Sequence, residues 1–274
     1  MTTTSPPPVD RDLLDFAVSV VAAAGSLAAD WFFRGATRRR KDDGSEVTEA
    51  DLAVEELIRG EVARRTPDDG VLGEETGESP GRSGRRWVID PISGTAYFSR
   101  RMPLFAQLLA YEDEFGCALG IIGMPVQREI VFAGRGLGCW LLSGRDTPVA
   151  QARRTWVSDR PTLDGALTLT SNQHTWTHEL LGALHGRVTL AGAVHHHVLH
   201  LVTGRVDIAV GTAQAYDDLA PLPVLVAEAG GVVTDLLGHP VPSGAGTMLA
   251  ANPAVHREAL ALVAGLPHAS GPTT

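Results

Sequence analysis

Cysteine is scarce in this chain, which has only Cys117 and Cys139 among its 274 residues. Two cysteines are too few for the disulfide framework that holds many small secreted domains together. Both lie in apolar, strand-like surroundings, so we expect buried thiols in a reducing compartment and a cytoplasmic protein. The residues before Asp10 are polar and proline-rich, and they lack the apolar core of a secretory signal.

An excess of basic residues is also missing, because the formal net charge is -9 at pH 7. A dedicated nucleic-acid binder needs a basic face to neutralise phosphates, so we expect no nucleic-acid partner. The apolar stretch 16–33 is interrupted by polar residues, and it predicts an amphipathic helix rather than a membrane span. The single basic run, residues 38–41, is followed by Asp42 and Asp43. It is either a solvated loop or a loop that helps to hold an anionic substrate.

The residues that are present are typical of a globular enzyme, with 44% apolar and 20% charged side chains. Asp10 is a plausible N-cap for a first helix, whose apolar stripe ends before Gly35. Thr48 and Asp51 resemble a capping box that opens a second helix. Apolar runs then predict strands at 87–89, 105–111, 117–122, 128–132 and 138–142.

Beyond residue 145 the predicted elements alternate between strand and helix. Strands are expected at 167–169, 207–210 and 232–234, and helices at 194–202, 219–229 and 255–264. We therefore divide the chain into a disordered tail (1–9), an N-terminal α+β half with the acidic motifs (10–145), a C-terminal α/β half (146–266) and a second tail (267–274). These elements suggest two layered α/β halves.

Acidic residues gather at the ends of predicted elements in three places. Glu74 and Glu75 follow one apolar run, Asp90 follows another, and Asp217-Asp218 precede a helix. Carboxylates at strand ends suit a hard cation such as Mg²⁺. Taken singly, a Glu-Glu pair is more often a solvated turn and Asp218 a helix N-cap.

Together these patches resemble the motifs of the inositol monophosphatase superfamily. Residues 87–95 read WVIDPISGT, close to the family signature W-x-x-D-P-I-D-G-T. GEE at 73–75, VTEAD at 47–51 and the D-x9-E-A-G-G spacing of 218–231 match the other motifs in order. The match runs from about residue 10 to 264, and its style is nearest to histidinol-phosphate phosphatases. It implies an α/β fold, layered as an αβαβα sandwich of the inositol monophosphatase and fructose-1,6-bisphosphatase type, and a homodimer.

The resemblance also implies hydrolysis of a phosphomonoester with the help of Mg²⁺. It assigns the metal ligands to Glu74, Asp90, the Ile92 carbonyl and Asp218, and catalytic roles to Thr95, Asp51 and Glu74. Thr95, oriented by Asp51, would hold the water that attacks phosphorus. The N–H groups of Gly94 and Thr95 would bind the phosphate if a helix starts there.

The chain departs from the family pattern at several of these positions. Ser93 replaces the aspartate that binds the second metal, a loss expected to weaken that site by several kcal/mol at an effective dielectric constant of about 20. Tyr97 replaces an asparagine, and Asp217 replaces the tryptophan before the last metal ligand. The stretch 210–214 has no acid where the family has one that binds a substrate hydroxyl. Inositol is therefore an unfavourable substrate, and we place Ser93, Tyr97 and Asp217 among the substrate-binding residues.

Histidines are concentrated at His195, His196, His197 and His200. On a helix, His196 and His200 share a face at i, i+4, a spacing that can bind a metal. They lie where the family has the helix that lines the substrate pocket. They are either ordinary helix histidines, substrate-binding or acid–base residues, or ligands of a transition metal.

Three functions remain open at this point. The first is a Mg²⁺-dependent phosphatase with an impaired second metal site, acting on a sugar, amino-alcohol or nucleotide phosphate. The second is a repurposed enzyme that catalyses a non-hydrolytic step in specialised metabolism. The third is a non-catalytic relative that binds or regulates a partner.

Overall fold

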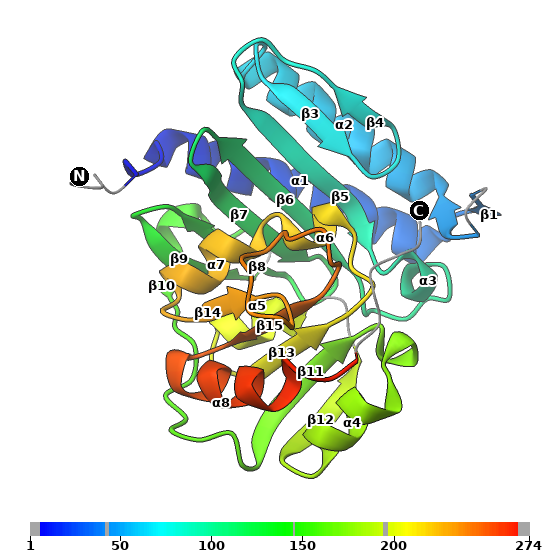
Figure 1. Ribbon diagram of the computed structural model, residues 1–274. Helices are drawn as coiled ribbons and strands as arrows, with labels where there is room; N and C mark the ends of the chain where they lie inside the picture. Colours follow the sequence, from blue (N-terminus) through cyan, green and yellow to red (C-terminus); the bar gives the residue numbers. More distant parts are fainter. Residues whose placement is uncertain (1–5, 42–43, 145, 194–196, 268–274) are drawn as a thin grey trace.

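The computed structural model describes residues 6–41, 44–144, 146–193 and 197–267. Layers of helix and sheet alternate, with a helical layer between the two main sheets (Figure 1). This order confirms the predicted layered αβαβα sandwich. The helices are α1 (Arg11–Arg34), α2 (Glu49–Arg65), α3 (Thr95–Phe98), α4 (His178–His185), α5 (His197–Val202), α6 (Tyr216–Leu219), α7 (Leu222–Glu228) and α8 (Pro253–Val263), with short 3₁₀ turns η1 (Val149–Gln151) and η2 (Gln173–Thr175).

The large sheet has eight strands in the order β10-β9-β8-β7-β6-β5-β3-β4. Neighbouring strands are antiparallel, except for the parallel pair β3 and β5. Helices α1 and α2 cover one face of this sheet, and α6 and α7 cover the other. Its strands are β3 (Gly70–Gly73), β4 (Gly77–Ser79), β5 (Arg86–Ser93), β6 (Ala106–Asp113), β7 (Gly116–Met124), β8 (Glu129–Gly134), β9 (Gly138–Ser143) and β10 (Arg153–Arg154).

The small sheet has five strands in the order β12-β11-β13-β15-β14. Strands β11, β12 and β13 run parallel, whereas β15 is antiparallel to both of its neighbours. Its strands are β11 (Ala166–Ser171), β12 (Val188–Ala193), β13 (Ile208–Gly211), β14 (Val232–Thr234) and β15 (Met248–Ala251). A separate hairpin pairs β1 (Arg38–Arg40) with β2 (Glu46–Thr48).

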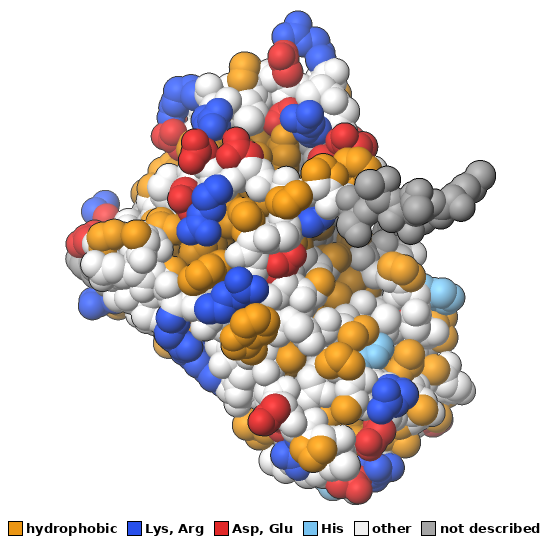
Figure 2. Space-filling view, turned by 90° about the vertical axis from the view of Figure 1, so that its left-hand side faces the viewer, with side chains coloured by type: hydrophobic (Ala, Val, Ile, Leu, Met, Phe, Trp, Pro, Cys, Tyr) orange, Lys and Arg blue, Asp and Glu red, His pale blue; other side chains and the backbone are white. Residues whose placement is uncertain are grey.

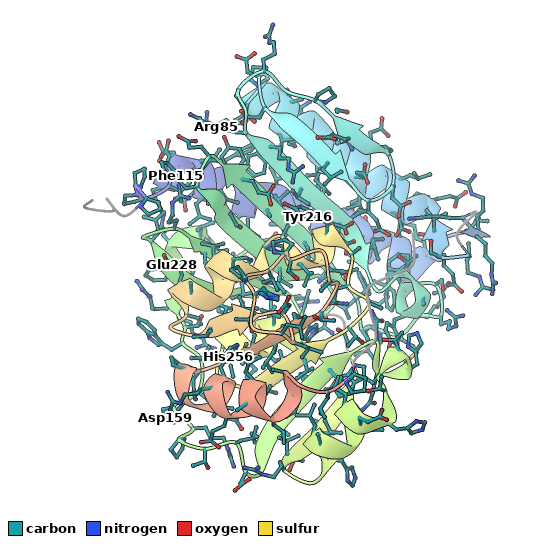
Figure 3. The ribbon with its side chains drawn as sticks, in the orientation of Figure 1. Arg85, Phe115, Asp159, Tyr216, Glu228 and His256 are labelled. Carbon is teal, nitrogen blue, oxygen red and sulfur yellow. The ribbon has the colours of Figure 1, made fainter. Side chains whose placement is uncertain are left out.

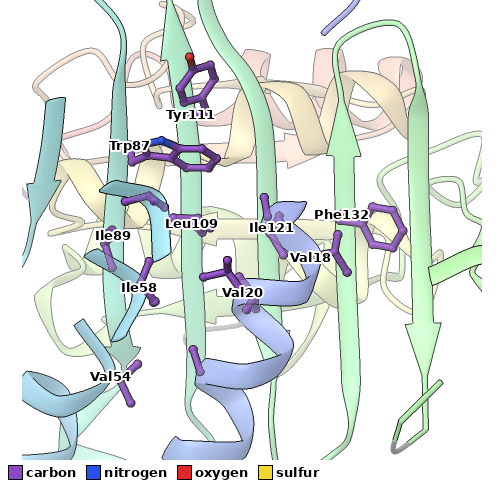
Figure 4. Close-up of a cluster of buried hydrophobic side chains, with 14 of the residues drawn as sticks. Val18, Val20, Val54, Ile58, Trp87, Ile89, Leu109, Tyr111, Ile121 and Phe132 are labelled. Carbon is purple, nitrogen blue, oxygen red and sulfur yellow. The ribbon is translucent and has the colours of Figure 1, made fainter. Parts of the chain in front are cut away.

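Helix α1 begins and ends where the sequence predicts. Asp10 caps it by accepting a hydrogen bond from the Asp12 N–H at 2.9 Å, and Gly35 ends it with a φ of 94°. The helix is long and apolar enough to cross a membrane by composition alone. In the structure its apolar side is instead buried on the large sheet, in the core that Figure 4 shows. That core joins Val18 of α1, Ile58 of α2 and sheet residues such as Trp87.

Some elements of the C-terminal half differ from the predictions. The helix expected over 219–229 is the shorter α7, which begins after Pro221, and the separate helix α6 before it was not predicted. Pro221 has no N–H to continue the helical hydrogen bonds from α6. Helix α4 and strands β12 and β15 were not predicted. Their short apolar runs, such as MLAA in β15, favour neither helix nor strand by periodicity alone.

On the face that Figure 2 shows, basic and acidic side chains are interspersed over most of the surface. The three arginines of β1, from the basic run noted above, are exposed. Lys41, the last residue of that run, is instead turned towards an acidic cluster at the end of the large sheet.

Candidate active site

A network of buried hydrogen bonds fixes Asp51 and Thr95 next to each other. Thr48 caps α2, and its N–H donates to Asp51 Oδ2 at 2.8 Å, which is the predicted capping box. The Thr95 hydroxyl lies 3.0 Å from Asp51 Oδ1 and 3.0 Å from the Ile92 carbonyl oxygen. Burial raises the pKa of Asp51, although the hydrogen bonds from Thr48 oppose this. A buried carboxylate with a raised pKa is suited to accept a proton through the threonine hydroxyl.

Strand β5 delivers Asp90 and Ser93 to the same end of the sheet. Asp90 is 3% exposed, and its Oδ1 atom has no hydrogen-bond partner within the described part of the chain. Burial raises the pKa of Asp90 well above its ordinary value, and the charges of Glu74 and Asp218 raise it further. An unpaired buried carboxylate oxygen is costly, so this atom calls for a proton or a cation.

Gly94 makes the turn between β5 and α3 possible. Its φ of 90° lies in the left-handed region, which a residue with a side chain rarely adopts. The turn places Thr95 at the start of α3 and leaves Tyr97 half-buried two residues further on.

Lys41 reaches into the acidic cluster from the β1–β2 hairpin. Its Nζ atom lies 2.8 Å from Glu75 Oε2 and 3.1 Å from Glu74 Oε1. Burial raises the pKa of Glu74 to about 7, with Asp217 and Asp218 adding to the rise and Lys41 opposing it. Burial likewise raises the pKa of Glu75 to about 7, against the effect of Lys41. Lys41 thus places a positive charge among the carboxylates. The basic run at 38–41 indicated only in general that this loop could lie near an anionic group.

The C-terminal half contributes Asp217 and Asp218 from α6. The Ser93 hydroxyl donates to Asp218 Oδ1 at 3.2 Å, and the Ala215 N–H donates to Asp218 Oδ2 at 3.0 Å. Burial, followed by the charge of Asp218, raises the pKa of Asp217 to about 7. Ser93 therefore links β5 to α6 at the position where the resemblance predicts an aspartate.

The donor atoms of this cluster suit a hard cation. They are carboxylate, hydroxyl and carbonyl oxygens. The charges of Asp217 and Asp218 add to the burial that raises the pKa of Glu74, and the charges of Glu74 and Asp218 do the same for Asp90. Across the residues that the structure describes, however, no three His, Cys, Asp or Glu side chains converge closely enough to form a finished metal site. The chemistry of the oxygen donors fits Mg²⁺.

Tyr216 anchors α6, and sequence reasoning missed it. Its hydroxyl donates to Glu112 Oε1 at 2.6 Å and accepts from Arg86 Nη2 at 2.8 Å, where α6 meets β5 and β6 (Figure 3). Arg86 in turn pairs with Glu112 at 2.7 Å. The only available signal was an aromatic residue just before the acidic pair, and its partners lie more than 100 positions away in the sequence.

The stretch 210–214, which is expected to lack a family acid, is tightly packed at Gly211. A Cβ atom there would lie 2.5 Å from Ser171 Oγ, so a side chain at this position would require Ser171 to move. Ser171 Oγ and Gln214 Nε2 are buried and have no hydrogen-bond partner among the described residues. Uncharged polar groups therefore lie next to Gly211.

The histidine cluster is described only in part. His195 and His196 lie outside the described residues, so the predicted pair of His196 with His200 stays a prediction. His197 is buried, with its Nε2 atom 3.0 Å from Met248 Sδ. Burial, then the charge of Arg205, lowers the pKa of His200, and Glu129 opposes this. The substrate role of His200 also stays a prediction.

The glutamate of the E-A-G-G motif has a structural role. Glu228 accepts hydrogen bonds from the N–H groups of Gly136 and Gly138, each at 2.6 Å, and so ties α7 to the β8–β9 turn. It lies at the end of α7, well separated from Tyr216 and α6 (Figure 3).

Comparison with known proteins establishes the family. Residues 10–267 match the model of the inositol monophosphatase family, and the chain belongs to that family. This confirms the resemblance carried by the four motifs.

The curated relatives include several histidinol-phosphatases. The protein from Chlorobaculum parvum is 33% identical over 252 residues, covering 91% of this chain and 96% of the relative. The one from Mycobacterium tuberculosis is 35% identical, covering 80% and 85%. Among solved structures, the inositol monophosphatase of Thermotoga maritima has a TM-score of 0.81 at 26% identity, covering 92% of this chain and 96% of that one.

Proposed function

We propose that this protein is a Mg²⁺-dependent phosphomonoesterase that acts on the phosphate ester of a small amino alcohol. The observation that carries the proposal is Asp90, whose buried and unpaired carboxylate oxygen lies in a carboxylate cluster. The Thr95–Asp51 pair supplies a proton acceptor at the same end of the sheet. Family membership and the histidinol-phosphatase relatives support the reaction class.

In this proposal the proton of the attacking water passes to the N-terminal half. When Thr95 donates its own hydrogen to Asp51 Oδ1, its lone pairs are free to accept a hydrogen bond from water. Asp51 has a raised pKa and is held by Thr48, so it takes up the proton without moving. The N–H groups of Gly94 and Thr95 would orient the phosphate.

Glu74, Asp90, Asp218 and the Ile92 carbonyl would hold the metal, with the Ser93 hydroxyl as a neutral oxygen at the second position. Bound Mg²⁺ would lower the pKa of the attacking water and stabilise negative charge on the phosphate. Lys41 would add a positive charge at the edge of the cluster, beside Glu74 and Glu75. Because Ser93 has no charge, the second site is expected to be weak.

The proposed leaving group follows from the polar groups beside Gly211. Ser171 Oγ and Gln214 Nε2 offer uncharged hydrogen-bonding atoms to a substrate, where an acid would favour a polyol such as inositol. Together with the relatives, this makes histidinol phosphate the first substrate to test. Tyr97, Asp217 and His200 are further candidates for substrate contact.

The test measures phosphate release from histidinol phosphate, inositol monophosphate and a nucleoside monophosphate, with and without Mg²⁺. The native chain, Ser93→Asp and Ser93→Ala are compared. We expect Mg²⁺-dependent release of phosphate from histidinol phosphate by the native chain. Ser93→Asp should lower the Mg²⁺ concentration needed for half-maximal rate by about tenfold or more, since a carboxylate replaces a neutral ligand. Ser93→Ala should raise it.

Ser93 in place of the expected aspartate and the Lys41 ammonium among the carboxylates favour two alternatives, a repurposed enzyme and a non-catalytic relative. If only Ser93→Asp released phosphate, the fold would still be able to support hydrolysis of a phosphate ester. The native chain would then no longer be a phosphatase. If neither the native chain nor either variant released phosphate from any substrate of the panel, hydrolysis would be contradicted as the function.

We further propose that the protein is a cytoplasmic homodimer. Cys117 and Cys139 are free cysteines that form no disulfide within the described residues, which suits a reducing compartment. A mass equal to one chain by light scattering would contradict the dimer.

A further inference from the structure

The turn between β3 and β4 carries both glutamates of the GEE motif. It consists of residues 74–76, so Glu74 and Glu75 lie at the tip of an antiparallel hairpin. The Glu74 N–H donates to the Ile89 carbonyl oxygen at 3.1 Å, which joins the turn to β5 just before Asp90. This bond holds the start of the turn, and the rest of the turn depends on contacts with another element.

Glu55 on α2 supplies those contacts. The Glu75 N–H donates to Glu55 Oε2 at 2.8 Å, and the Thr76 N–H donates to Glu55 Oε1 at 3.2 Å. The Thr76 hydroxyl also donates to Glu55 Oε1. Two successive backbone N–H groups after Glu74 therefore bind one carboxylate, which lies outside the four sequence motifs.

The Glu55 carboxylate is fully buried, and both of its oxygens have partners within the protein. Its Oε1 atom also accepts from Arg59 Nε at 2.8 Å, one helical turn further along α2. Arg59 in turn donates to the Gly77 carbonyl oxygen and to Ser79 Oγ of β4. A buried charge is tolerated when it is paired and hydrogen-bonded in this way. Glu55 is therefore placed to hold the hairpin rather than to bind a metal.

Gly73 allows the Glu55 carboxylate to come this close to the hairpin. A Cβ atom at position 73 would overlap that carboxylate and would lie 2.7 Å from Arg59 Nη2. Gly73 does not have a positive φ, so its backbone conformation alone does not require glycine. The close approach of Glu55 explains the glycine of the GEE motif.

We propose that Glu55 is the positioning residue for Glu74, and that it sets how tightly the acidic cluster binds a divalent cation. This inference rests on the proposed function, in which Glu74 and Asp90 hold Mg²⁺. Groups that orient a metal ligand matter because their loss typically weakens metal binding about 10–100-fold. Without Glu55, Glu74 would keep Lys41 as a partner at 3.1 Å, which favours this ion pair over the metal.

The experiment measures Mg²⁺ binding to the full chain by calorimetry. Glu55→Gln keeps the shape of the side chain but leaves only one oxygen for the N–H groups of Glu75 and Thr76. We expect the Kd for Mg²⁺ to rise at least about tenfold. Glu56→Gln, exposed on the same helix, is the matched control and should leave the Kd unchanged.

A second control separates positioning from a general loss of stability. Glu228 also accepts two backbone N–H groups, but it does so at the end of α7. Glu228→Gln should therefore destabilise the fold and leave the Kd for Mg²⁺ unchanged. Phosphate release by Glu55→Gln should recover at high Mg²⁺, with the KM for substrate within about twofold of native, because the reacting groups remain.

Hydrogen exchange of the metal-free protein reports on the turn itself. The amides of Glu75 and Thr76 should exchange about tenfold faster in Glu55→Gln than in the native chain or in Glu228→Gln, because they lose a hydrogen bond to a charged acceptor. Thr76→Val removes only one hydroxyl, so it tests the same contact if Glu55→Gln does not fold. It should raise the Kd for Mg²⁺ by about two- to fivefold.

Several results would overturn the positioning role. An unchanged Kd in Glu55→Gln, or an equal rise in Glu228→Gln, would do so and would leave the proposed function standing. Unaltered exchange of the Glu75 and Thr76 amides in Glu55→Gln would show that the turn does not depend on Glu55. If the native chain bound no Mg²⁺, both this inference and the proposed function would fail, so the two failures are distinguishable.

Discussion

The two halves of the chain position their residues of the acidic cluster in different ways. In the N-terminal half, Thr48, Asp51 and Thr95 form a closed set of buried hydrogen bonds around the capped end of α2. The C-terminal half supplies Asp217 and Asp218 on the short helix α6, which is tied to the large sheet through Tyr216. The N-terminal set is held by hydrogen bonds among its own members, whereas Asp217 and Asp218 are held through the contacts of Ser93 and Tyr216 between distant parts of the chain.

The expected departures from the family motifs fall on one side of this comparison. The Asp51–Thr95 pair and Asp90 match those motifs, whereas Ser93 and Asp217 are expected to differ from them, and these lie where the halves meet or in the C-terminal half. In the proposed mechanism the matching residues handle the water and its proton, and the differing ones face the second metal and the leaving group. Under this proposal the chemistry is retained while the substrate side differs.

The largest expected effect comes from replacing a carboxylate of the N-terminal half. Asp90→Asn removes the carboxylate central to the cluster, and we expect phosphate release to fall by about a thousandfold, or about 4 kcal/mol of transition-state stabilisation. The control is Asp159→Asn, an exposed residue near α8 and far from the cluster (Figure 3). A rate within twofold of the native chain for Asp90→Asn would remove Asp90 from the mechanism.

The next effect is a pH dependence of stability that involves carboxylates of both halves. Glu74, Glu75 and Asp217 have pKa values raised from 4.5, 4.5 and 3.8 to about 7. Between pH of about 4 and about 7 these three groups hold more protons in the metal-free native state than in the unfolded chain, so their contribution to stability should fall as the pH rises.

Urea unfolding of the metal-free protein at several pH values measures this effect. Added Mg²⁺ should restore stability mainly at the high end of the range, where the carboxylates are ionised. A stability that rises with pH across this range in the absence of metal would show that the carboxylates are not clustered as described.

The E-A-G-G glutamate offers a purely structural contrast within the C-terminal half. Glu228→Gln weakens the charged hydrogen bonds to Gly136 and Gly138, and we expect the free energy of unfolding to fall by about 1–3 kcal/mol. Phosphate release by the folded variant should stay within about twofold of native. Glu179→Gln, exposed on α4, should change stability by less than about 0.5 kcal/mol. A loss of activity without a loss of stability would contradict the structural role.

The smallest expected effect concerns Tyr216, which holds the helix α6 that carries Asp217 and Asp218. Tyr216→Phe removes the hydroxyl that joins Glu112 to Arg86, and we expect the Mg²⁺ concentration for half-maximal rate to rise by about three- to tenfold. The matched control is Tyr111→Phe, whose hydroxyl bonds Asp69 elsewhere. A rise in both variants, or in neither, would show that Tyr216 does not position α6.

The sequence predicted the N-terminal half better than the C-terminal half. The first two helices were predictable because their caps, Asp10 and Thr48, lie within three residues of their partners. Helix α7 was predicted too long and β15 was missed, because a proline break and a four-residue strand leave little periodicity to detect. The layered fold itself came from the order of four motifs, and the family match confirms it.

The sequence by itself determined the family, the acidic residue types and the neutral residue at position 93, because each of these is readable in short, contiguous motifs. Only the tertiary structure decided that Lys41 lies among the carboxylates, that Ser93 bonds to Asp218, and that Tyr216 joins Glu112 to Arg86. These facts arise from residues far apart in the chain that the packing of the sheets and helices brings together. Local propensity and periodicity carry no information about such contacts, and so the chemistry of the site had to be derived from the fold.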